Sequence, residues 1–435
     1  MQFGRLLPVS VLLLSAACGS SPQGAAPMPE STLGWAQASD PEPQSAPVGS
    51  KALSGLGQND PSPHRGPALP RERLALATTI PQDRVEASAN DGGAGPTTSP
   101  DAANTATASP PSLHVSAGTI LDGTGTPVVL HGVNRSGSEF ACVGGFGFFD
   151  GPTDAASIVA MKAWNINAVR VPLNEDCWLG INGVAAAYSG ANYQQAVVAY
   201  VDLLLANGMF PIVDLHWSAP GTTLATEQQA MADADHSPAF WTSVAGMFKS
   251  RGQVIFELYN EPWPDNNQDT TAAWTCWRDG GACPSIDFEV AGMQTLVDAV
   301  RATGASNLLL LGGVEYSNAL SQWAAYKPVD PENNVAAAWH VYQGNVCSDL
   351  ACFDQVAAPL ALQFPIVTTE VGDTSCDGAF LTTVMSWLDA HGQSYSAWAW
   401  NAWGSACGSY SLISDYTGTP GGAYGLAYQA HLSGL

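Results

Sequence analysis

Apolar runs recur along the chain after residue 112, and each one is typical of a buried β-strand. They cover residues 128–134, 168–173, 210–217, 254–262, 307–314, 335–342, 364–372 and 395–403. Most of the segments between them carry apolar residues at helical spacing, clearest in 154–165, 193–208 and 379–392 and weakest in 319–326. Strands that alternate with helices in this way predict an α/β protein with a single (β/α)8 TIM barrel over residues 112–435.

Two further patterns refine this prediction. Residues 113–130 contain Gly-rich turns between short apolar stretches and predict a hairpin that leads into the first barrel strand. A doubly wound open sheet is the alternative to a barrel, but no Gly-x-Gly-x-x-Gly sequence opens a helix.

Most of the apolar runs become polar or aromatic toward their carboxyl ends. The residues concerned are Asn134, Arg135, Arg170, Asp214, His216, Asn260, Glu261, His340, Tyr342, Glu370 and Trp400. In a barrel the carboxyl ends of the strands meet on one face, where catalytic groups lie. The pattern therefore predicts one functional site at that face.

Arg170 stands between Val169 and Val171 in an apolar strand. A guanidinium does not lose its proton, so at a buried position it needs a carboxylate partner. Glu261 and Glu370 follow apolar strands and are candidates for that partner and for acid–base chemistry. Two carboxylates at one rim, one of them beside an arginine, are what cleavage of a glycosidic bond requires.

Tryptophans gather at the strand ends and in the loops that follow them, namely Trp217, Trp263, Trp274, Trp277, Trp398, Trp400 and Trp403. In loops we interpret them as stacking surfaces for sugar rings. A metal site built from Asp214, His216 and His340 is an alternative, although the HxH and HExxH spacings that would make it specific are absent. We expect no metal and no cofactor.

The first 18 residues, MQFGRLLPVSVLLLSAAC, place an arginine before a short apolar run and small residues before Cys18. This is typical of an export signal, and its ending predicts lipidation of Cys18, with an ordinary cleaved signal as the alternative. Residues 19–111 are rich in Ala, Ser, Pro, Gly and Thr and predict a disordered tether. We expect an exported protein on a bacterial cell surface or outer membrane, or else an extracellular one.

Composition narrows the partners. The 435-residue chain has a formal net charge of −24 and only 14 Lys and Arg residues, which argues against nucleic acid and suits a neutral substrate. Eight cysteines remain besides Cys18, an even number that predicts disulfides in an exported chain. Local spacing favours Cys276–Cys283 and Cys347–Cys352. The remaining cysteines would pair as Cys142–Cys177 and Cys376–Cys407, although the sequence leaves the connectivity open.

An ordered set of motifs resembles glycoside hydrolase family 5, the cellulase-type retaining enzymes with a (β/α)8 fold. The motifs are HGVN (131–134), VRVP (169–172), DLHW (214–217), NEP (260–262), WHVY (339–342), TTEVG (368–372) and AWAWN (397–401). The resemblance covers about residues 113–435. The Cys-rich loops are not general features of that family, and they leave the substrate open.

The resemblance implies that Glu261 is the acid/base, Glu370 the nucleophile and Asn260 the donor to the sugar 2-hydroxyl. It further implies that Arg170 and Tyr342 neighbour Glu370, that His216 and His340 line the substrate site, and that Trp400 forms the floor of the cleaved-sugar subsite. We therefore expect a monomeric retaining β-glycoside hydrolase of a β-glucan, mannan or related polysaccharide. The alternatives are a metal-dependent barrel hydrolase and a non-catalytic carbohydrate-binding barrel.

Overall fold

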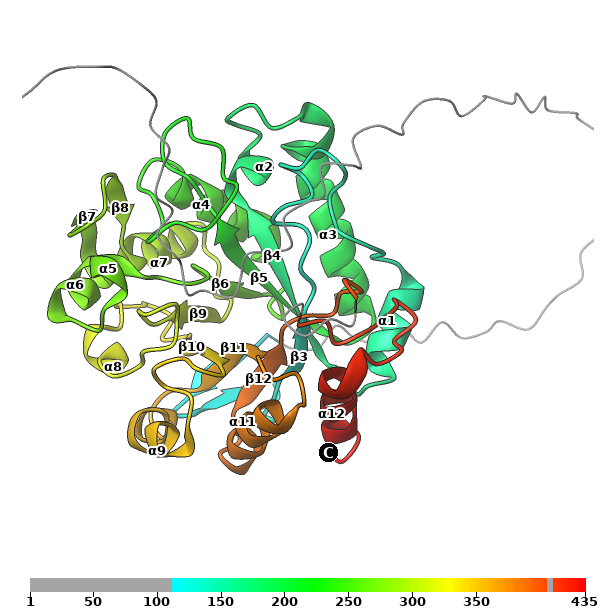
Figure 1. The fold of residues 1–435 in the computed structure, drawn as a ribbon. Helices are drawn as coiled ribbons and strands as arrows, with labels where there is room; N and C mark the ends of the chain where they lie inside the picture. Colours follow the sequence, from blue (N-terminus) through cyan, green and yellow to red (C-terminus); the bar gives the residue numbers. More distant parts are fainter. Residues whose placement is uncertain (1–111, 405–409) are drawn as a thin grey trace, which may run out of the picture. The chain divides into compact units, whose positions relative to one another are not determined.

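Eight parallel strands close into a barrel in the computed structural model, which describes residues 112–404 and 410–435 (Figure 1). In order around the barrel they are β3 (His131–Asn134), β4 (Ala168–Asn174), β5 (Phe210–Trp217), β6 (Ile255–Glu257), β9 (Leu309–Gly312), β10 (Val335–Tyr342), β11 (Ile366–Gly372) and β12 (Ser394–Ala397). The predicted (β/α)8 class is confirmed. The predicted export signal and tether lie outside the described residues, as do Cys18 and Cys407.

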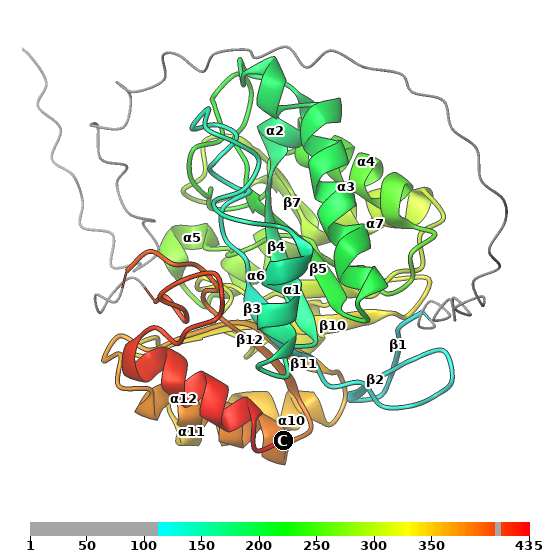
Figure 2. The ribbon, with the colours of Figure 1, turned by 90° about the vertical axis from the view of Figure 1, so that its right-hand side faces the viewer.

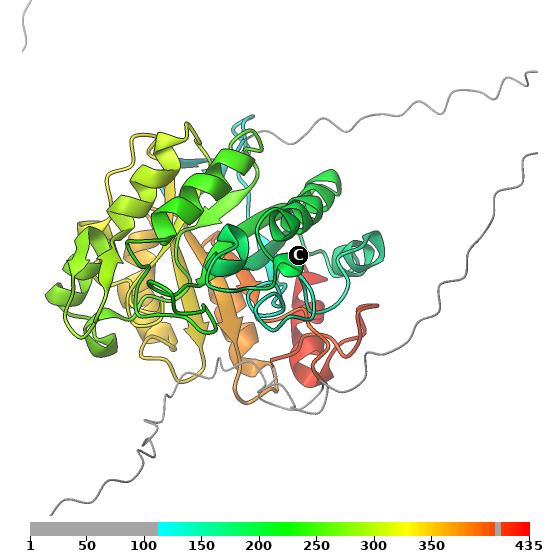
Figure 3. The same ribbon diagram turned by 90° about the horizontal axis from the view of Figure 1, so that it is seen from above.

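Helices surround the barrel strands on the outside (Figures 1 and 3). They are α1 (Ala155–Lys162), α2 (Glu175–Leu179), α3 (Ala191–Ala206), α4 (Ser237–Phe248), α5 (Pro264–Asn267), α6 (Thr271–Asp279), α7 (Met293–Ala302), α8 (Trp323–Tyr326), α9 (Leu350–Cys352), α10 (Ala358–Ala361), α11 (Ala379–Ala390) and α12 (Gly422–Leu432). Residues Ala186–Tyr188 form a 3₁₀ turn and Phe353–Ala357 a π turn. No helix among the described residues is long and apolar enough to cross a membrane.

The helices expected from the apolar spacing are present. The segments 154–165, 193–208 and 379–392 form α1, α3 and α11, whereas 319–326 forms only the four residues of α8. Helix α3 ends as expected before Gly208, which adopts a left-handed φ of 72°. The C-terminal helix α12 packs beside α11, as the two views show (Figures 1 and 2).

The amino end of the barrel is filled with apolar side chains. Those of Leu130, Ala168, Ile212, Ile255, Leu308, Leu310, Ala336, Ala338 and Val367 pack together there with Leu113 and Ile120. Leu113 directly precedes β1 (His114–Ser116), and Ile120 lies in β2 (Thr119–Leu121). These two strands pair antiparallel and form the predicted hairpin. Leu113 N donates to Gly252 O at 3.0 Å, so the hairpin closes this end of the barrel.

Strand alternation places polar side chains directly above this apolar layer. Along β4, Ala168 belongs to the interior cluster, whereas Val169 and Val171 belong to the outer core under the helices. Arg170 therefore points to the barrel interior, one step closer to the carboxyl end than Ala168. The same two-residue step leads from Ile255 to Glu257 on β6, so charged groups meet above the apolar layer.

Strand β6 is shorter than the apolar run 254–262 predicts, since it ends at Glu257. The backbone beyond it stays attached to its neighbours: Leu258 N donates to Leu310 O at 3.0 Å and Asn260 N to Leu215 O at 3.1 Å. Pro262 has no N–H to extend the ladder. Glu261 thus lies just past the strand rather than in it.

A second hairpin lies outside the barrel, formed by β7 (Gly280–Ala282) and β8 (Glu289–Ala291). It follows α6 directly, and the Cys276–Cys283 disulfide joins that helix to the turn after β7. The cysteine-rich segment after Glu261 is thus a small ordered unit at the carboxyl side of β6.

Candidate active site

Arg170 is the central charge of the site. Its side chain is fully buried, and its guanidinium contacts three carboxylates: Nε lies 2.6 Å from Glu257 Oε2, Nη1 lies 2.6 Å from Glu370 Oε1, and Nη2 lies 2.7 Å from Asp214 Oδ2. Burial opposes its charge, but these carboxylates raise the pKa of Arg170 above its ordinary value. The prediction that Arg170 holds a carboxylate is confirmed, with two more partners than expected.

Of these three partners, Asp214 and Glu370 were expected at the site from the sequence, and Glu257 was not. Glu257 lies inside β6 between Phe256 and Leu258, and a carboxylate flanked by apolar strand residues is the same signal that identified Arg170. Burial raises the pKa of Glu257, but Arg170 and His340 outweigh burial and lower it. Glu257 is therefore held as an anion.

Glu370 on β11 receives one hydrogen bond on each carboxyl oxygen. Arg170 Nη1 donates to Oε1 at 2.6 Å, and the hydroxyl of Tyr342, the last residue of β10, donates to Oε2 at 2.6 Å. Together the two donors fix the plane of the Glu370 carboxyl group. Burial, together with the negative charge of Glu370, raises the pKa of Tyr342 well above its ordinary value, so the phenol keeps its proton.

Glu261 is held by His340 of β10. The distance between His340 Nδ1 and Glu261 Oε1 is 2.9 Å, and Nε2 of the same ring lies 3.1 Å from Thr369 Oγ1. Burial opposes protonation of His340, but the carboxylates of Glu370, Glu257 and Glu261 raise its pKa to about 10. At neutral pH this imidazole carries a proton beside Glu261.

The two candidate catalytic carboxylates face each other. One oxygen of Glu261, one oxygen of Glu370 and a nitrogen of His340 all lie within 4.8 Å of one another. All three side chains are nearly fully buried in the protein alone. The structure thus brings together the two carboxylates that the sequence placed at separate strand ends.

His216, at the end of β5, lies next to this group. Its Nδ1 is 3.3 Å from Asp214 Oδ2, and its ring stacks on Trp398 with centroids 5.6 Å apart and 12° between the planes. Burial opposes protonation, but Asp214 raises the pKa of His216 above its ordinary value. His216 therefore lies in the site, with an aromatic ring beside it.

The implied role of Trp400 needs correction. Its side chain is 0% exposed, and its ring packs edge-on against Trp164 with centroids 4.9 Å apart. A fully enclosed ring has no face to offer a sugar. Trp398, the first residue after β12, is the aromatic residue that lies beside His216.

Asn260 connects Arg170 to a loop residue that the sequence did not single out. Its Oδ1 accepts from Arg170 Nη2 at 2.7 Å, and its Nδ2 donates to Gln228 Oε1 at 2.7 Å. Gln228 belongs to the loop between β5 and α4, which has no regular pattern from which its position could be inferred. Asn134 also accepts from Arg170, at 3.0 Å.

The cysteines follow the expected pairing as far as the structure describes them. Cys142–Cys177, Cys276–Cys283 and Cys347–Cys352 are bonded. Cys376 is also disulfide-bonded, while its expected partner Cys407 lies outside the described residues. All of these bonds follow carboxyl ends of barrel strands.

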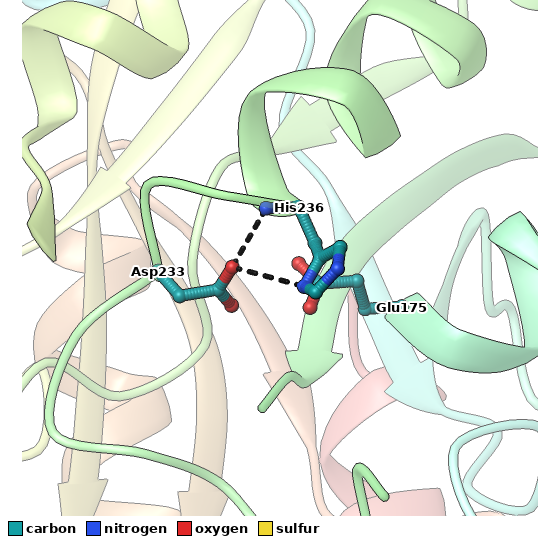
Figure 4. A group of neighbouring side chains, drawn as sticks. All are labelled: Glu175, Asp233 and His236. Atoms are coloured by element: carbon teal, nitrogen blue, oxygen red, sulfur yellow. Dashed lines mark hydrogen bonds and ion pairs between the residues drawn. The ribbon is translucent and has the colours of Figure 1, made fainter. Parts of the chain in front are cut away.

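A second group of titratable side chains lies at the start of α2 and α4. Figure 4 shows the Asp233 carboxylate directed at His236, whose Nδ1 is 3.6 Å from Oδ1. Glu175 and Asp233 are both buried, and Ser237 Oγ lies 2.6 Å from Glu175 Oε1 and 3.2 Å from Asp233 Oδ2. Burial and the neighbouring Asp233 raise the pKa of Glu175, and burial with Asp235 raises that of Asp233 to about 6.

Residues 112–404 and 410–435 contain side-chain groups that could hold a metal ion. Two groups have carboxylate and imidazole atoms close enough to share a divalent cation: Glu261, His340 and Glu370, and Glu175, Asp233 and His236. The alternative set from the sequence does not converge in this way, because Asp214 pairs with Arg170 while His340 faces Glu261.

The fold and the paired carboxylates define a glycoside hydrolase of the barrel class, and a sequence comparison names the family. The profile described as Cellulase (glycosyl hydrolase family 5) matches residues 121–405, more than half of the chain. The chain therefore belongs to glycosyl hydrolase family 5 and is a cellulase- or mannanase-type O-glycosyl hydrolase. A retaining mechanism is general to this family.

Curated relatives of two specificities are similar to the chain. A mannan endo-1,4-beta-mannosidase of Streptomyces lividans is 23% identical over 320 residues, which covers 70% of each chain. An endoglucanase of Bacillus sp. (strain KSM-635) is 25% identical over 237 residues, covering 52% of this chain and 21% of the relative. The chain thus spans only about a fifth of that endoglucanase.

Solved structures share the fold. The beta-glucanase SdGluc5_26A from Saccharophagus degradans superposes with a TM-score of 0.57 at 17% identity, covering 78% of this chain and 97% of the other. The catalytic domain of a mannanase from Streptomyces sp. SirexAA-E gives a TM-score of 0.52 at 18% identity, covering 77% and 94%. These structures support the barrel and do not choose between the two substrates.

Proposed function

We propose that the chain is a retaining β-glycoside hydrolase of a β-glucan, in which Glu370 is the nucleophile and Glu261 the acid/base. The observation that carries this proposal is the facing pair of carboxylates, whose nearest oxygens lie within 4.8 Å. Carboxyl groups about 5–5.5 Å apart suit double displacement, whereas inversion needs a wider gap that admits water.

The surroundings of each carboxylate support its role. Glu370 accepts from Arg170 and Tyr342, and these two hydrogen bonds orient it for attack on the anomeric carbon. Glu261 contacts His340, which holds a proton at neutral pH. A proton shared between His340 and Glu261 can be passed to the glycosidic oxygen as the leaving group departs. The same pair can later take up the proton that is removed from water.

The reaction then follows from the geometry. Glu370 attacks the anomeric carbon while Glu261 protonates the glycosidic oxygen, and the C–O bond to the leaving sugar breaks. In the covalent intermediate Glu370 no longer carries the charge that Arg170 faced. Glu261, now ionised, removes a proton from water, which attacks the same carbon and releases a product of retained configuration.

Three measurements test these roles. A release-of-reducing-sugar screen over cellulose, mixed β-glucan, mannan, xylan and xyloglucan identifies the substrate, and we expect β-glucans to lead. An aryl 2-deoxy-2-fluoro-β-cellobioside should label Glu370. Glu370→Gln should abolish turnover, whereas Glu261→Gln should still release phenol from activated aryl glycosides.

Several results would contradict the assignment. A label on Glu261 would show that the two roles are reversed. A product of inverted configuration, observed by NMR, would show that no covalent nucleophile takes part. Loss of activity with a chelator and recovery with a divalent cation would favour the metal-dependent alternative, for which Glu261, His340 and Glu370 supply donors. Binding of glucan without any hydrolysis would favour the non-catalytic alternative.

We also propose that the protein is exported and anchored through a lipid on Cys18. The apolar run before Cys18 and the Pro- and Ser-rich segment 19–111 support this proposal. Fractionation of cells that express the chain should find activity with the membrane, and Cys18→Ala should release it. Activity that stays in the cytosol in both cases would contradict export.

A further inference from the structure

Gln228 makes a contact that neither the family match nor the two proposed catalytic roles account for. It lies half-buried in the loop between β5 and α4. Its Oε1 accepts from Asn260 Nδ2 at 2.7 Å. Asn260 directly precedes Glu261, so this loop residue reaches the residue next to the proposed acid/base.

The loop that carries Gln228 is tied to the backbone on both sides of Glu261. The hydroxyl of Tyr259 donates to Gln229 O at 2.8 Å, and Trp263 N donates to Ala230 O at 2.9 Å. These bonds lie one and two residues after Gln228. The position of Gln228 is therefore set by the same segment that positions Glu261.

Arg170 determines which way the Asn260 amide faces. Because Arg170 Nη2 donates to Asn260 Oδ1 at 2.7 Å, Nδ2 is the end directed at Gln228. Gln228 Nε2 makes no hydrogen bond to another residue in the described part of the chain. The two side chains thus present a donor, Asn260 Nδ2, next to an acceptor, Gln228 Oε1, with a further donor free.

We propose that Gln228 is a specificity-determining residue that recognises the equatorial 2-hydroxyl of the sugar at the cleavage position. This inference rests on the proposed function, in which Asn260 donates to that hydroxyl. Beyond the 2.7 Å bond between them, Asn260 Nδ2 has a second hydrogen and Gln228 Oε1 a second lone pair. A hydroxyl beside the pair can therefore accept from Nδ2 and donate to Oε1.

The configuration at C2 then decides the fit. An equatorial hydroxyl, as in glucose, points along the ring plane and meets both amides, whereas the axial hydroxyl of mannose points away from that plane. A sugar that misses the pair forgoes its hydrogen bonds to both amides, which costs affinity in the transition state. Gln228 would therefore favour glucosides over mannosides.

The test compares ratios within each variant. For wild type, Gln228→Met and Gln228→Glu, kcat/KM is measured on an aryl β-cellobioside, its analogue lacking the 2-hydroxyl of the cleaved sugar, and an aryl β-mannobioside. Gln229→Met is the matched control, since Gln229 bonds through its backbone oxygen and, among the described residues, its side chain makes no hydrogen bond. Circular dichroism and thermal unfolding check that each variant folds.

We expect Gln228→Met to reduce the ratio of the cellobioside to its 2-deoxy analogue about tenfold, the effect of one hydrogen bond near 1.4 kcal/mol. Gln228→Glu retains the acceptor and should keep that ratio within about threefold, because its added charge affects both substrates alike. Gln229→Met should leave the ratio unchanged. In an Asn260→Ala background, Gln228→Met should have no further effect on it.

An unchanged ratio in a folded Gln228→Met variant would overturn the inference and leave the proposed function intact. A ratio that falls equally in Gln228→Met and Gln229→Met would show a general disturbance of the loop, and would overturn it also. If wild type hydrolyses no β-glycoside, the proposed function fails, and this inference fails with it.

Discussion

Arg170 Nη1 on β4 lies 2.6 Å from Glu370 Oε1 on β11, two strands that are not hydrogen-bonded neighbours. The guanidinium spans the barrel interior and meets Glu257 of β6 with its Nε at 2.6 Å. One side chain therefore joins strands from three parts of the barrel. It connects the apolar layer below to Glu370, the proposed nucleophile, above.

Arg170→Lys should reduce kcat about 100-fold or more, because an ammonium cannot reach three carboxylates in different directions and a small displacement of the nucleophile is costly. It should also destabilise the fold by about 3–5 kcal/mol, the cost of breaking a buried ion pair. Steady-state kinetics and urea unfolding measure the two effects. Arg251→Lys is the control, since its pair with Asp202 is partly exposed and should cost under about 1 kcal/mol.

Glu257→Gln should lower stability by about 1.5–3 kcal/mol while reducing kcat only modestly, about tenfold or less. The amide keeps the shape of the carboxylate but removes the charged acceptor of Arg170 Nε. The exposed Glu227 supplies the control substitution, Glu227→Gln. A fall in kcat as deep as that of Glu370→Gln would mean that Glu257 acts on the substrate directly.

Asp233 should make the protein less stable as the pH rises. Its pKa is raised from 3.8 to about 6 in the folded state, so folding favours the protonated form. This contribution is complete below about pH 4 and is lost as the pH passes 6, with a total on the order of 3 kcal/mol. Urea unfolding at intervals between pH 4.5 and 7.5 measures it.

The comparison with Asp233→Asn isolates that contribution. The amide does not ionise, so the difference in unfolding free energy between variant and wild type should shift in favour of the variant as the pH rises. Asp287→Asn, at an exposed position, should show a constant difference. A constant difference for Asp233→Asn as well would contradict the raised pKa.

Removing the Cys142–Cys177 bond should cost more than removing Cys347–Cys352. The first closes 35 residues and the second 5, which gives upper values of about 4 and about 2 kcal/mol from loop entropy. Paired Cys→Ala variants and thermal unfolding measure the order. Because the bonded cysteines lie near the carboxyl ends of the strands, activity should fall before circular dichroism during reduction, and simultaneous loss would contradict that.

A variant that begins at residue 112 should keep its kcat/KM on a soluble glucoside within about twofold of the full chain. The segment 19–111 carries few apolar residues with which to build a site, and Trp35 is its single aromatic residue. The variant must retain Leu113, whose N–H bonds to Gly252 O. A large loss of turnover would show that the removed segment contributes to catalysis.

The barrel strands and most of the main helices could be predicted from the sequence, because the spacing of apolar residues in strands and helices is a local property. The apolar runs determined the barrel strands, and the change to polar residues at each run's end placed Glu261, Glu370 and Arg170 at one face. Arg170 between two valines demanded a buried carboxylate before any partner was known. Local spacing also predicted the short disulfides Cys276–Cys283 and Cys347–Cys352, which formed.

Only the tertiary structure decided which carboxylates contact the Arg170 guanidinium and which aromatic side chain lies beside the proposed catalytic residues. Arg170 meets Asp214 and Glu257 because closure of the barrel brings separate strands to one interior layer, and no local pattern encodes that meeting. Trp398 lies beside His216 while Trp400 is enclosed. Both residues follow the end of β12, where the regular alternation of side chains no longer predicts their directions. Gln228 reaches Asn260 through an irregular loop, whose path depends on its anchors and not on any periodicity.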